Sequence, residues 1–189
     1  YFTDGDGRIY KDKVSNQQWN DLTHFEGNAN ALRILTHPYA GKGYGSFSLT
    51  YSTIAAIAKY PCASLAGHDK SNIYTKKYGF FQSGQAVFEK IATELDISKV
   101  QDDPLVYKRH PLVYLVEAAD DICYSIIDLE DAQRLKILTY PELEVLLLAL
   151  CNDPAMPARL AEIEDIDARV SLMRAKSISN LVKQCADLF

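Results

Sequence analysis

Cysteine is scarce in this sequence and follows no metal-binding or disulfide spacing. The four cysteines are scattered over 189 residues, and no two of them form a C-x-x-C pair. Cys123 and Cys151 lie in apolar segments with a helical pattern, where a reduced thiol fits as a small apolar side chain. The cysteines therefore favour a reducing compartment, and we expect a cytoplasmic protein.

Long hydrophobic runs are absent, and glycine and proline are few. No apolar run approaches the roughly 20 residues that a membrane-spanning helix needs, and no signal peptide opens the chain, so we expect no membrane partner. Nine glycines, seven prolines and a hydrophobic content of 48% exclude a disordered chain and predict a compact globular one. Because the first residue is Tyr1 rather than methionine, we expect a fragment or a processed product.

Several familiar catalytic motifs are also missing. The sequence contains no G-x-x-x-x-G-K-[ST], no G-x-G-x-x-G that opens a helix, no H-E-x-x-H and no G-x-S-x-G. The glycines at 41, 43 and 45 predict a turn and not a phosphate-binding loop. The four histidines form no spaced ligand cluster, and the His68-Asp69 dipeptide lies in a polar loop without the rigid element that a metal site needs.

Charge is distributed unevenly along the chain, whose formal net charge is −5. Between Pro38 and Lys90 the acidic residues are only Asp69 and Glu89, whereas the lysines in this segment are Lys42, Lys59, Lys70, Lys76, Lys77 and Lys90. A basic segment in an acidic protein indicates a local anion partner such as phosphate. A solvated lysine face explains the same pattern, and both interpretations stay open.

The hydrophobic periodicity predicts an all-α fold. After a turn-rich lead-in over 1–15, with a short extended piece at residues 8–10, the expected helices cover 16–37, 52–59, 84–95, 111–134, 141–151 and 157–188. Residues 61–82 are polar and lysine-rich, and they predict a long loop of the kind that is often functional. We therefore expect a main helical domain over 16–151 and a C-terminal helical extension over 152–189.

The predicted helix at 111–134 carries acids on an apolar background. Its first 22 residues are apolar nearly all the way round, which is typical of a helix buried in a bundle. Asp120, Tyr124 and Asp128 are spaced i, i+4 and i+8 and therefore share one stripe. Buried carboxylates are costly without a cation, a metal or several donors, so the stripe predicts either a metal-facing acid or ion pairs with neighbouring helices. The flanking acids are expected to face solvent or cations; they are Glu117, Asp121, Glu130 and Asp131.

Four segments together resemble the HD-domain deoxynucleoside triphosphate triphosphohydrolases, the dGTPase family. Residues 24–33, HFEGNANALR, resemble the HFEGNAQ segment of that family. Residues 117–132, EAADDICYSIIDLEDA, resemble its EAADDI-x-Y-x-x-x-DLEDA helix, and residues 59–60 and 76–81 resemble its KY and KK-x-GYY segments in the same order. The resemblance spans roughly residues 20–140 and implies part of an HD-domain-like helical bundle.

The resemblance also implies an activity and roles for particular residues. Members of the family hydrolyse a deoxynucleoside triphosphate to the deoxynucleoside and intact triphosphate, with a divalent metal such as Mn, Mg or Fe. Asp120 matches a metal ligand, Tyr124 matches the tyrosine under the deoxyribose, and Asp128 matches an acid close to the same site. The positions that match triphosphate-binding residues are Asn28, Lys59, Tyr60 and Lys77. The expected substrate is dGTP; family resemblance further implies a homo-oligomer, and single-stranded nucleic acid or a nucleotide effector as a partner.

The sequence departs from the family pattern in an important respect. It has no H-D-x-G-x-x-P-F-x-H segment, which supplies three of the four metal ligands and the catalytic His and Glu, and Asn30 stands where Gln is usual. We therefore expect no catalytic residue here beyond one metal ligand, weak or no metal binding, and no turnover by this chain alone. The alternatives are a non-catalytic nucleotide-binding or oligomerisation module, and an unrelated helical bundle.

Overall fold

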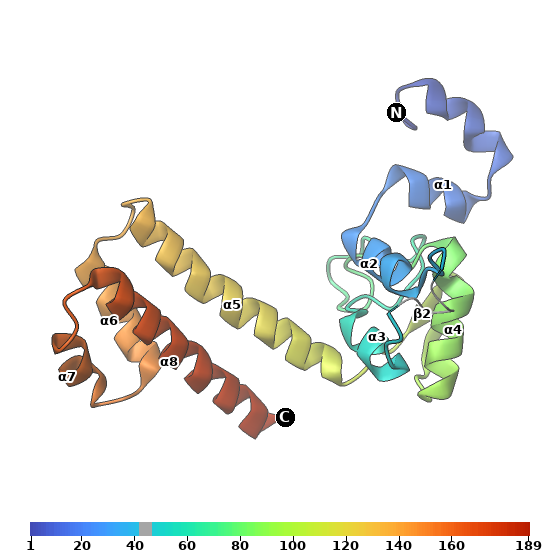
Figure 1. Cartoon of the computed structure of the whole chain (residues 1–189). Helices are drawn as coiled ribbons and strands as arrows, with labels where there is room; N and C mark the ends of the chain where they lie inside the picture. Colours follow the sequence, from blue (N-terminus) through green and yellow to red (C-terminus); the bar gives the residue numbers. More distant parts are fainter. Residues whose placement is uncertain (42–46) are drawn as a thin grey trace. The chain divides into compact units, whose positions relative to one another are not determined.

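The protein is predominantly helical and divides into two compact units, each described by itself. The structure is a computed structural model that describes residues 1–41 and 47–189 (Figure 1). The first unit is Tyr1–Val113 and the second is Tyr114–Phe189. The predicted all-α class is confirmed, since the described residues are mostly helical and contain only one small, two-stranded sheet. Lys42, Gly43 and Gly45 lie outside the described residues. No helix of the described ranges is long and apolar enough to cross a membrane.

The N-terminal part of the first unit forms three short helices where one was expected. They are η1 (Asp6–Lys13), a 3-10 helix, followed by α1 (Asn16–Thr23) and α2 (Gly27–Thr36). The prediction of a short extended piece at residues 8–10 is therefore wrong, because these residues belong to η1. Ser15 and Gln18 form a capping box that starts α1, and the Glu26 side chain accepts the Asn28 N–H and starts α2. A second cap inside the predicted helix satisfies donors that would otherwise be unpaired, so the chain turns there.

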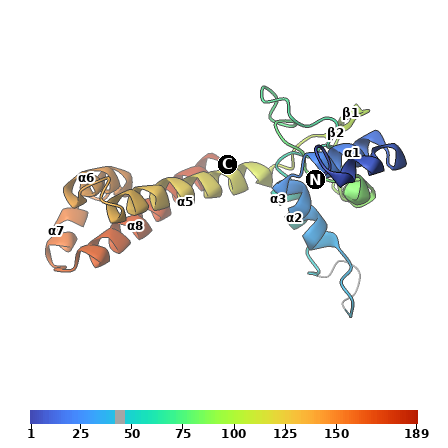
Figure 2. The same cartoon turned by 90° about the horizontal axis from the view of Figure 1, so that it is seen from above.

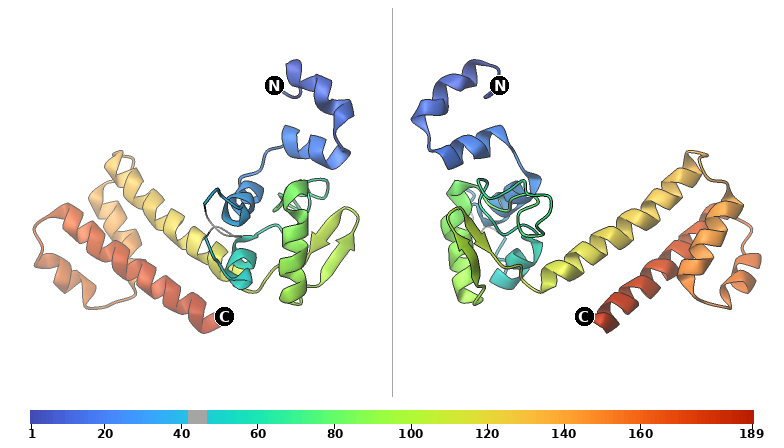
Figure 3. Two further views of the ribbon diagram at one scale, coloured as in Figure 1. Left: turned by 45° about the vertical axis from the view of Figure 1, so that its right-hand side comes forward. Right: turned by 180° about the vertical axis from the view of Figure 1, so that it is seen from behind.

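The rest of the first unit combines two α-helices with a β-hairpin. These elements are α3 (Tyr51–Ile57), η2 (Gln82–Gly84), α4 (Gln85–Glu94), β1 (Lys99–Asp102) and β2 (Leu105–Tyr107). The strands are antiparallel, with Lys99 opposite Tyr107 and Asp102 opposite Leu105. The hairpin lies beside α4 (Figure 3), and Leu105 and Tyr107 share a core with Phe88 and Ile91 of that helix. All three residues of β2 are buried, so it lacks the alternation that identifies a strand in sequence.

The lysine-rich segment expected as a long loop is anchored at both ends. Residues 61–81 contain no helix and run as loops (Figure 2). At the start, the Ala63 N–H donates to the Leu105 carbonyl (2.9 Å) and the Pro61 carbonyl accepts the Tyr107 N–H (2.9 Å). At the end, the Gly79 N–H donates to the Cys62 carbonyl (3.1 Å), and Ala63 forms a parallel bridge with Phe80. Residues 61–63 thus lie between β2 and residues 79–80.

The second unit is a helical bundle around its own core. Its helices are α5 (Leu112–Arg134), whose first two residues belong to the first unit, α6 (Tyr140–Cys151), α7 (Met156–Ala161) and α8 (Ile166–Leu188). α6 and α8 lie side by side (Figures 1 and 3). The helix expected over 157–188 is broken before Asp165, whose side chain caps α8 by accepting the Ala168 N–H. The domain boundary expected after residue 151 falls inside this unit, because α6 and α8 share one core.

Helix α5 is not buried on all sides, so the expectation of a helix enclosed in a bundle is wrong. Among its residues only Val113, Ile126 and Glu130 are buried. Ile126 belongs to the core of the second unit, and Leu129 packs against that core. The rest of the helix is half-buried or exposed, including Tyr124, 67% of which is exposed.

Candidate functional site

Three segments that are distant in sequence converge in the first unit, and each carries residues expected to bind triphosphate. They are the start of α2 (residues 26–28), the turn at residues 59–62 and the segment at residues 77–79. The Tyr78 hydroxyl donates to the His24 carbonyl (2.7 Å), and the Cys62 thiol donates to the Lys77 carbonyl (3.3 Å). Gly79 lies directly against the Tyr60 carbonyl: a Cβ there would be 2.2 Å from that oxygen. The absence of a side chain at Gly79 therefore permits the contact between the last two segments.

A single carboxylate oxygen links two of the expected residues. Glu26 Oε1 accepts the Asn28 amide Nδ2–H (2.6 Å) and the Asn28 backbone N–H (3.2 Å), and it lies 3.9 Å from Lys77 Nζ. The Glu26 side chain is only 14% exposed, whereas Lys77 is 51% exposed. A long ion pair with a half-exposed lysine is weak. The Lys77 ammonium therefore stays accessible to an anion from solvent.

Lys59 and Tyr60 lie at the turn that follows α3. Tyr60 is buried and its carbonyl accepts the Cys62 N–H (2.7 Å). The Arg109 guanidinium carbon lies 5.6 Å from the centre of the Tyr60 ring, within the range of a cation–π contact. Lys59 is half-buried. This pair therefore belongs to the packed part of the first unit and borders the segment that carries Lys77.

Burial shifts the pKa of several groups around these segments. Desolvation raises the pKa of the Tyr78 hydroxyl, and the negative charges of Asp21 and Glu26 raise it further, so the hydroxyl stays a donor to His24. Burial also raises the pKa of the Cys62 thiol to about 12, which keeps it protonated and unreactive. Desolvation raises the pKa of the Asp21 carboxyl, and hydrogen bonds from Ser64 and from the Gln82 N–H offset part of this effect.

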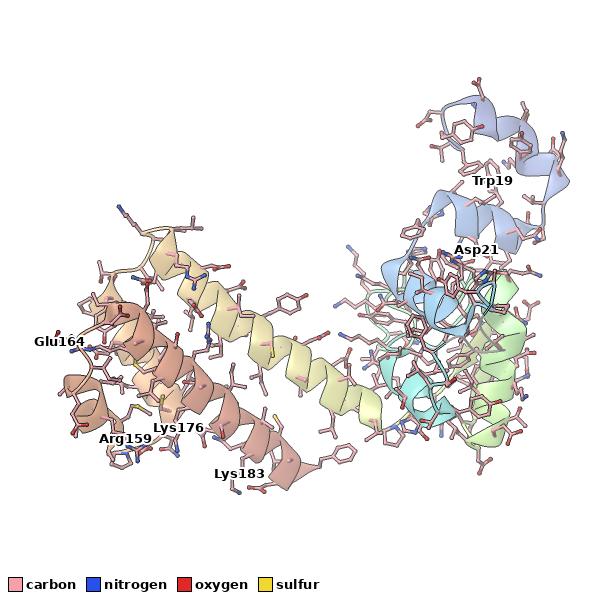
Figure 4. The ribbon with its side chains drawn as sticks, viewed as in Figure 1. Trp19, Asp21, Arg159, Glu164, Lys176 and Lys183 are labelled. Atoms are coloured by element: carbon pink, nitrogen blue, oxygen red, sulfur yellow. The ribbon has the colours of Figure 1, made fainter. Side chains whose placement is uncertain are left out.

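A cavity of about 480 Å³ opens beside α1 in the same unit. Trp19 and Asp21 both belong to this helix (Figure 4), and Asp21 lines the cavity. The other lining residues are mostly apolar; they are Phe2, Val14, Gln18, Leu22, Phe25, Phe81, Gln82 and Ser83. The Phe25 and Phe81 rings are 6.1 Å apart and tilted by 37°.

The acid and tyrosine stripe lies on α5 in the second unit. Asp120 is half-buried, and Tyr124 and Asp128 are exposed. The helix is continuous from Leu112 to Arg134, so the expected i, i+4, i+8 spacing places the three residues along one side of it. Within the described ranges, no group of three or more His, Cys, Asp or Glu side chains could hold a metal ion. Asp120 can therefore be one ligand of a metal site, but the described residues do not complete such a site.

Two acids have contacts that the sequence did not assign to them. Glu26 lies inside the HFEGN segment, and its place two residues before Asn28, at the start of a helix, was the available signal. Glu130 was expected to face solvent or cations; it is buried and faces two cations, Arg134 and Arg174, although the sequence did not identify these partners. The histidines His24 and His68, which are distant in sequence, have ring centres 5.3 Å apart.

Comparison with known proteins identifies relatives along the whole chain. A deoxyguanosinetriphosphate triphosphohydrolase-like protein of Pseudomonas aeruginosa is 38% identical over 193 residues, which cover 100% of this chain and 42% of the relative. A protein of the same name from Synechocystis is 36% identical over an alignment that covers 89% of this chain and 38% of the relative.

A deoxyguanosinetriphosphate triphosphohydrolase of Serratia proteamaculans is 36% identical over 66% of this chain and 23% of the relative. The chain thus spans less than half the length of each of these curated relatives. No protein-family model matches it. The relatives nevertheless align with all or most of its residues, and the chain belongs to the family of deoxyguanosinetriphosphate triphosphohydrolase-like proteins.

Proposed function

We propose that this chain is the nucleotide-binding part of a metal-dependent hydrolase that converts a deoxynucleoside triphosphate, most simply dGTP, to the deoxynucleoside and triphosphate. The single observation that carries the proposal is the convergence in the first unit of the segments with Asn28, Tyr60 and Lys77. These segments come from different parts of the chain. Because they meet, residues that match triphosphate-binding positions of the family lie close together in space.

In this proposal the residues of the first unit bind the triphosphate. The ammonium groups of Lys59 and Lys77 act as point charges that offset the negative charge of the phosphates, and the Asn28 amide contributes a directional donor. The half-exposed state of Lys77 and its weak pair with Glu26 support this role, because a strongly paired lysine would be less available.

The residues of α5 have the other proposed roles. Asp120 is one ligand of a divalent metal ion, and Tyr124 contacts the deoxyribose, where its ring leaves no room for a 2′-hydroxyl. Asp128, two turns after Asp120 on the same helix, is the third residue of this metal- and sugar-binding stripe. An Asp and a Tyr one helical turn apart can reach a metal ion and a sugar together. The described residues alone do not fit a complete metal site, so we assign no chemical step to the ion.

The proposal is tested by measuring dGTP affinity calorimetrically for the purified chain and two lysine variants. Lys77→Ala should weaken dGTP binding about tenfold, the usual loss for one charge-assisted hydrogen bond. Lys76→Ala removes the same charge from the neighbouring exposed position and should change affinity less than twofold. Equal losses from both variants would mean an unspecific basic surface and would contradict the proposal.

Turnover is measured separately on the complete natural protein. Release of deoxyguanosine together with inorganic triphosphate from dGTP is expected, and Asp120→Ala should abolish it. Specific dGTP binding without turnover by the complete protein would favour the second candidate, a non-catalytic nucleotide-binding module.

A further inference from the structure

Glu130 of α5 is a buried carboxylate that the proposed nucleotide site does not use. Its side chain is 8% exposed. A buried carboxylate is costly unless each oxygen has a strong donor. Both oxygens are in fact paired: Oε1 accepts from Arg134 Nη2 (2.7 Å) and Oε2 from Arg174 Nη1 (2.6 Å). These short distances are typical of charge-assisted hydrogen bonds.

The two arginines differ in what they connect. Arg134 lies one turn further along α5 and its side chain is 65% exposed, so its contact joins two residues of the same helix. Arg174 belongs to α8, so its contact joins two helices through residues that are 44 positions apart in sequence. Only the Arg174 contact can therefore restrain α5 against rotation relative to α8.

Apolar packing one turn earlier acts in the same direction. Ile126 is buried in the core that contains Leu147, Val170 and Met173. Ile126 and Glu130 are spaced i and i+4, so they lie on one side of α5. An apolar contact and an ion pair on the same side fix which side of α5 faces the core of the second unit.

Two residues of the proposed stripe, Tyr124 and Asp128, lie on the side of α5 away from this core. Each residue of an α-helix advances about 100° around its axis, so Glu130 is about 200° from Asp128, and Ile126 is about 200° from Tyr124. Asp120 is only about 80° from Glu130 by the same rule and lies on the flank of the helix, in agreement with its half-buried state. The exposure of Tyr124 and Asp128 agrees with this geometry. The rotation that buries Glu130 is thus the rotation that turns Tyr124 and Asp128 away from this core.

We propose that Glu130, held by Arg174, is a positioning residue that sets the rotation of α5 and so the direction in which Asp120, Tyr124 and Asp128 project. This inference rests on the proposed function only in that the stripe of Asp120, Tyr124 and Asp128 is taken to bind metal and sugar. The rotation itself is a property of the second unit and is measured without nucleotide.

The test compares Arg174→Gln with Arg134→Gln in two thiol-bearing backgrounds, Tyr124→Cys and Ile126→Cys. Both backgrounds also carry Cys123→Ser, because the native Cys123 thiol is exposed and lies in the same peptide. Alkylation rates at each introduced thiol are measured by peptide-resolved mass spectrometry on the folded chain. With both arginines present, the thiol from Tyr124→Cys should react at least tenfold faster than the thiol from Ile126→Cys. Arg174→Gln should reduce this ratio to below threefold, and Arg134→Gln should leave it near its original value because that contact stays within α5.

A ratio that stays at tenfold in folded Arg174→Gln protein would overturn the proposal, as would an equal fall in both variants. Circular dichroism shows whether the helices persist; if Arg174→Gln unfolds the unit, Arg174→Lys keeps the charge with fewer donors and should still lower the ratio. A second measurement in the complete protein is the preference for dGTP over GTP, which Arg174→Gln should lower at least threefold. If Tyr124→Ala does not change that preference, the sugar-binding role fails, whereas the thiol ratio still decides the role of Glu130.

Discussion

At the scale of single residues, the first unit places a carboxylate next to the groups that we propose to bind phosphate. Glu26 caps α2 and orients the Asn28 amide, and it also contributes negative charge 3.9 Å from Lys77. The two effects oppose each other for an incoming anion: the hydrogen bonds to Asn28 organise the site, and the charge repels the ligand. An isosteric substitution separates them.

Glu26→Gln should strengthen the binding of inorganic triphosphate two- to fivefold. The Gln carbonyl still accepts both Asn28 donors, while loss of the charge frees Lys77; a weak pair of this kind is worth about 1 kcal/mol or less. Glu26→Ala should not strengthen binding, because it also removes the helix cap. Titration calorimetry at fixed ionic strength gives the affinities. Glu94→Gln removes a charge from the exposed end of α4 and serves as the control; the same gain from it would attribute the effect to net charge.

At the scale of elements, the helices follow from periodicity and the connections follow from contacts. Periodicity predicted α3, α4, α5 and α6 within a few residues, because each helix presents a regular apolar side. The hairpin was missed since β2 is three buried residues long, and the breaks before α2 and α8 depend on local caps. The anchoring of residues 61–63 between β2 and residues 79–80 involves partners that are distant in sequence, which periodicity does not reveal.

Gly79→Ala should disrupt that anchoring. The added Cβ would lie 2.2 Å from the Tyr60 carbonyl oxygen, a backbone atom that cannot turn away. We expect a loss of about 3 kcal/mol in unfolding free energy, at the upper end for overpacking, and weaker nucleotide binding because Lys77 shifts. Urea denaturation measures the first effect. Gly84→Ala is the control, since its Cβ would be 3.8 Å from its nearest neighbour and the substitution should cost little; an equal loss from that variant would show that the close contact at Gly79 is not responsible.

At the scale of the whole molecule, the two units have separate cores. The core residues around Phe80 and Phe88 all lie in the first unit, and those around Leu143 and Leu147 all lie in the second. Within the second unit, Asp153 pairs with Arg159 (3.5 Å) and Lys176 (3.3 Å), and the two basic residues are labelled in Figure 4. A destabilising substitution in one core should therefore lower the stability of its own unit first.

Leu147→Ala should lower the stability of the second unit by about 2–5 kcal/mol, since it opens a cavity in a fully buried position. Amide hydrogen exchange should accelerate in α6 and α8 and stay unchanged in α3 and α4. Val145→Ala, an exposed position on the same helix, provides the comparison and should have little effect. Faster exchange throughout both units would show that they unfold as one cooperative body.

The sequence by itself determined the helical class, most helix positions and the family, because these depend on local periodicity and on short motifs. It also identified Asn28, Lys77 and the α5 stripe as candidates, and their roles remain proposals. The tertiary structure alone decided that the segments of Asn28, Tyr60 and Lys77 meet, that α5 is covered on one side only, and that Glu130 pairs with Arg174. Each of these contacts joins residues far apart in the chain, so they depend on packing that no local pattern encodes.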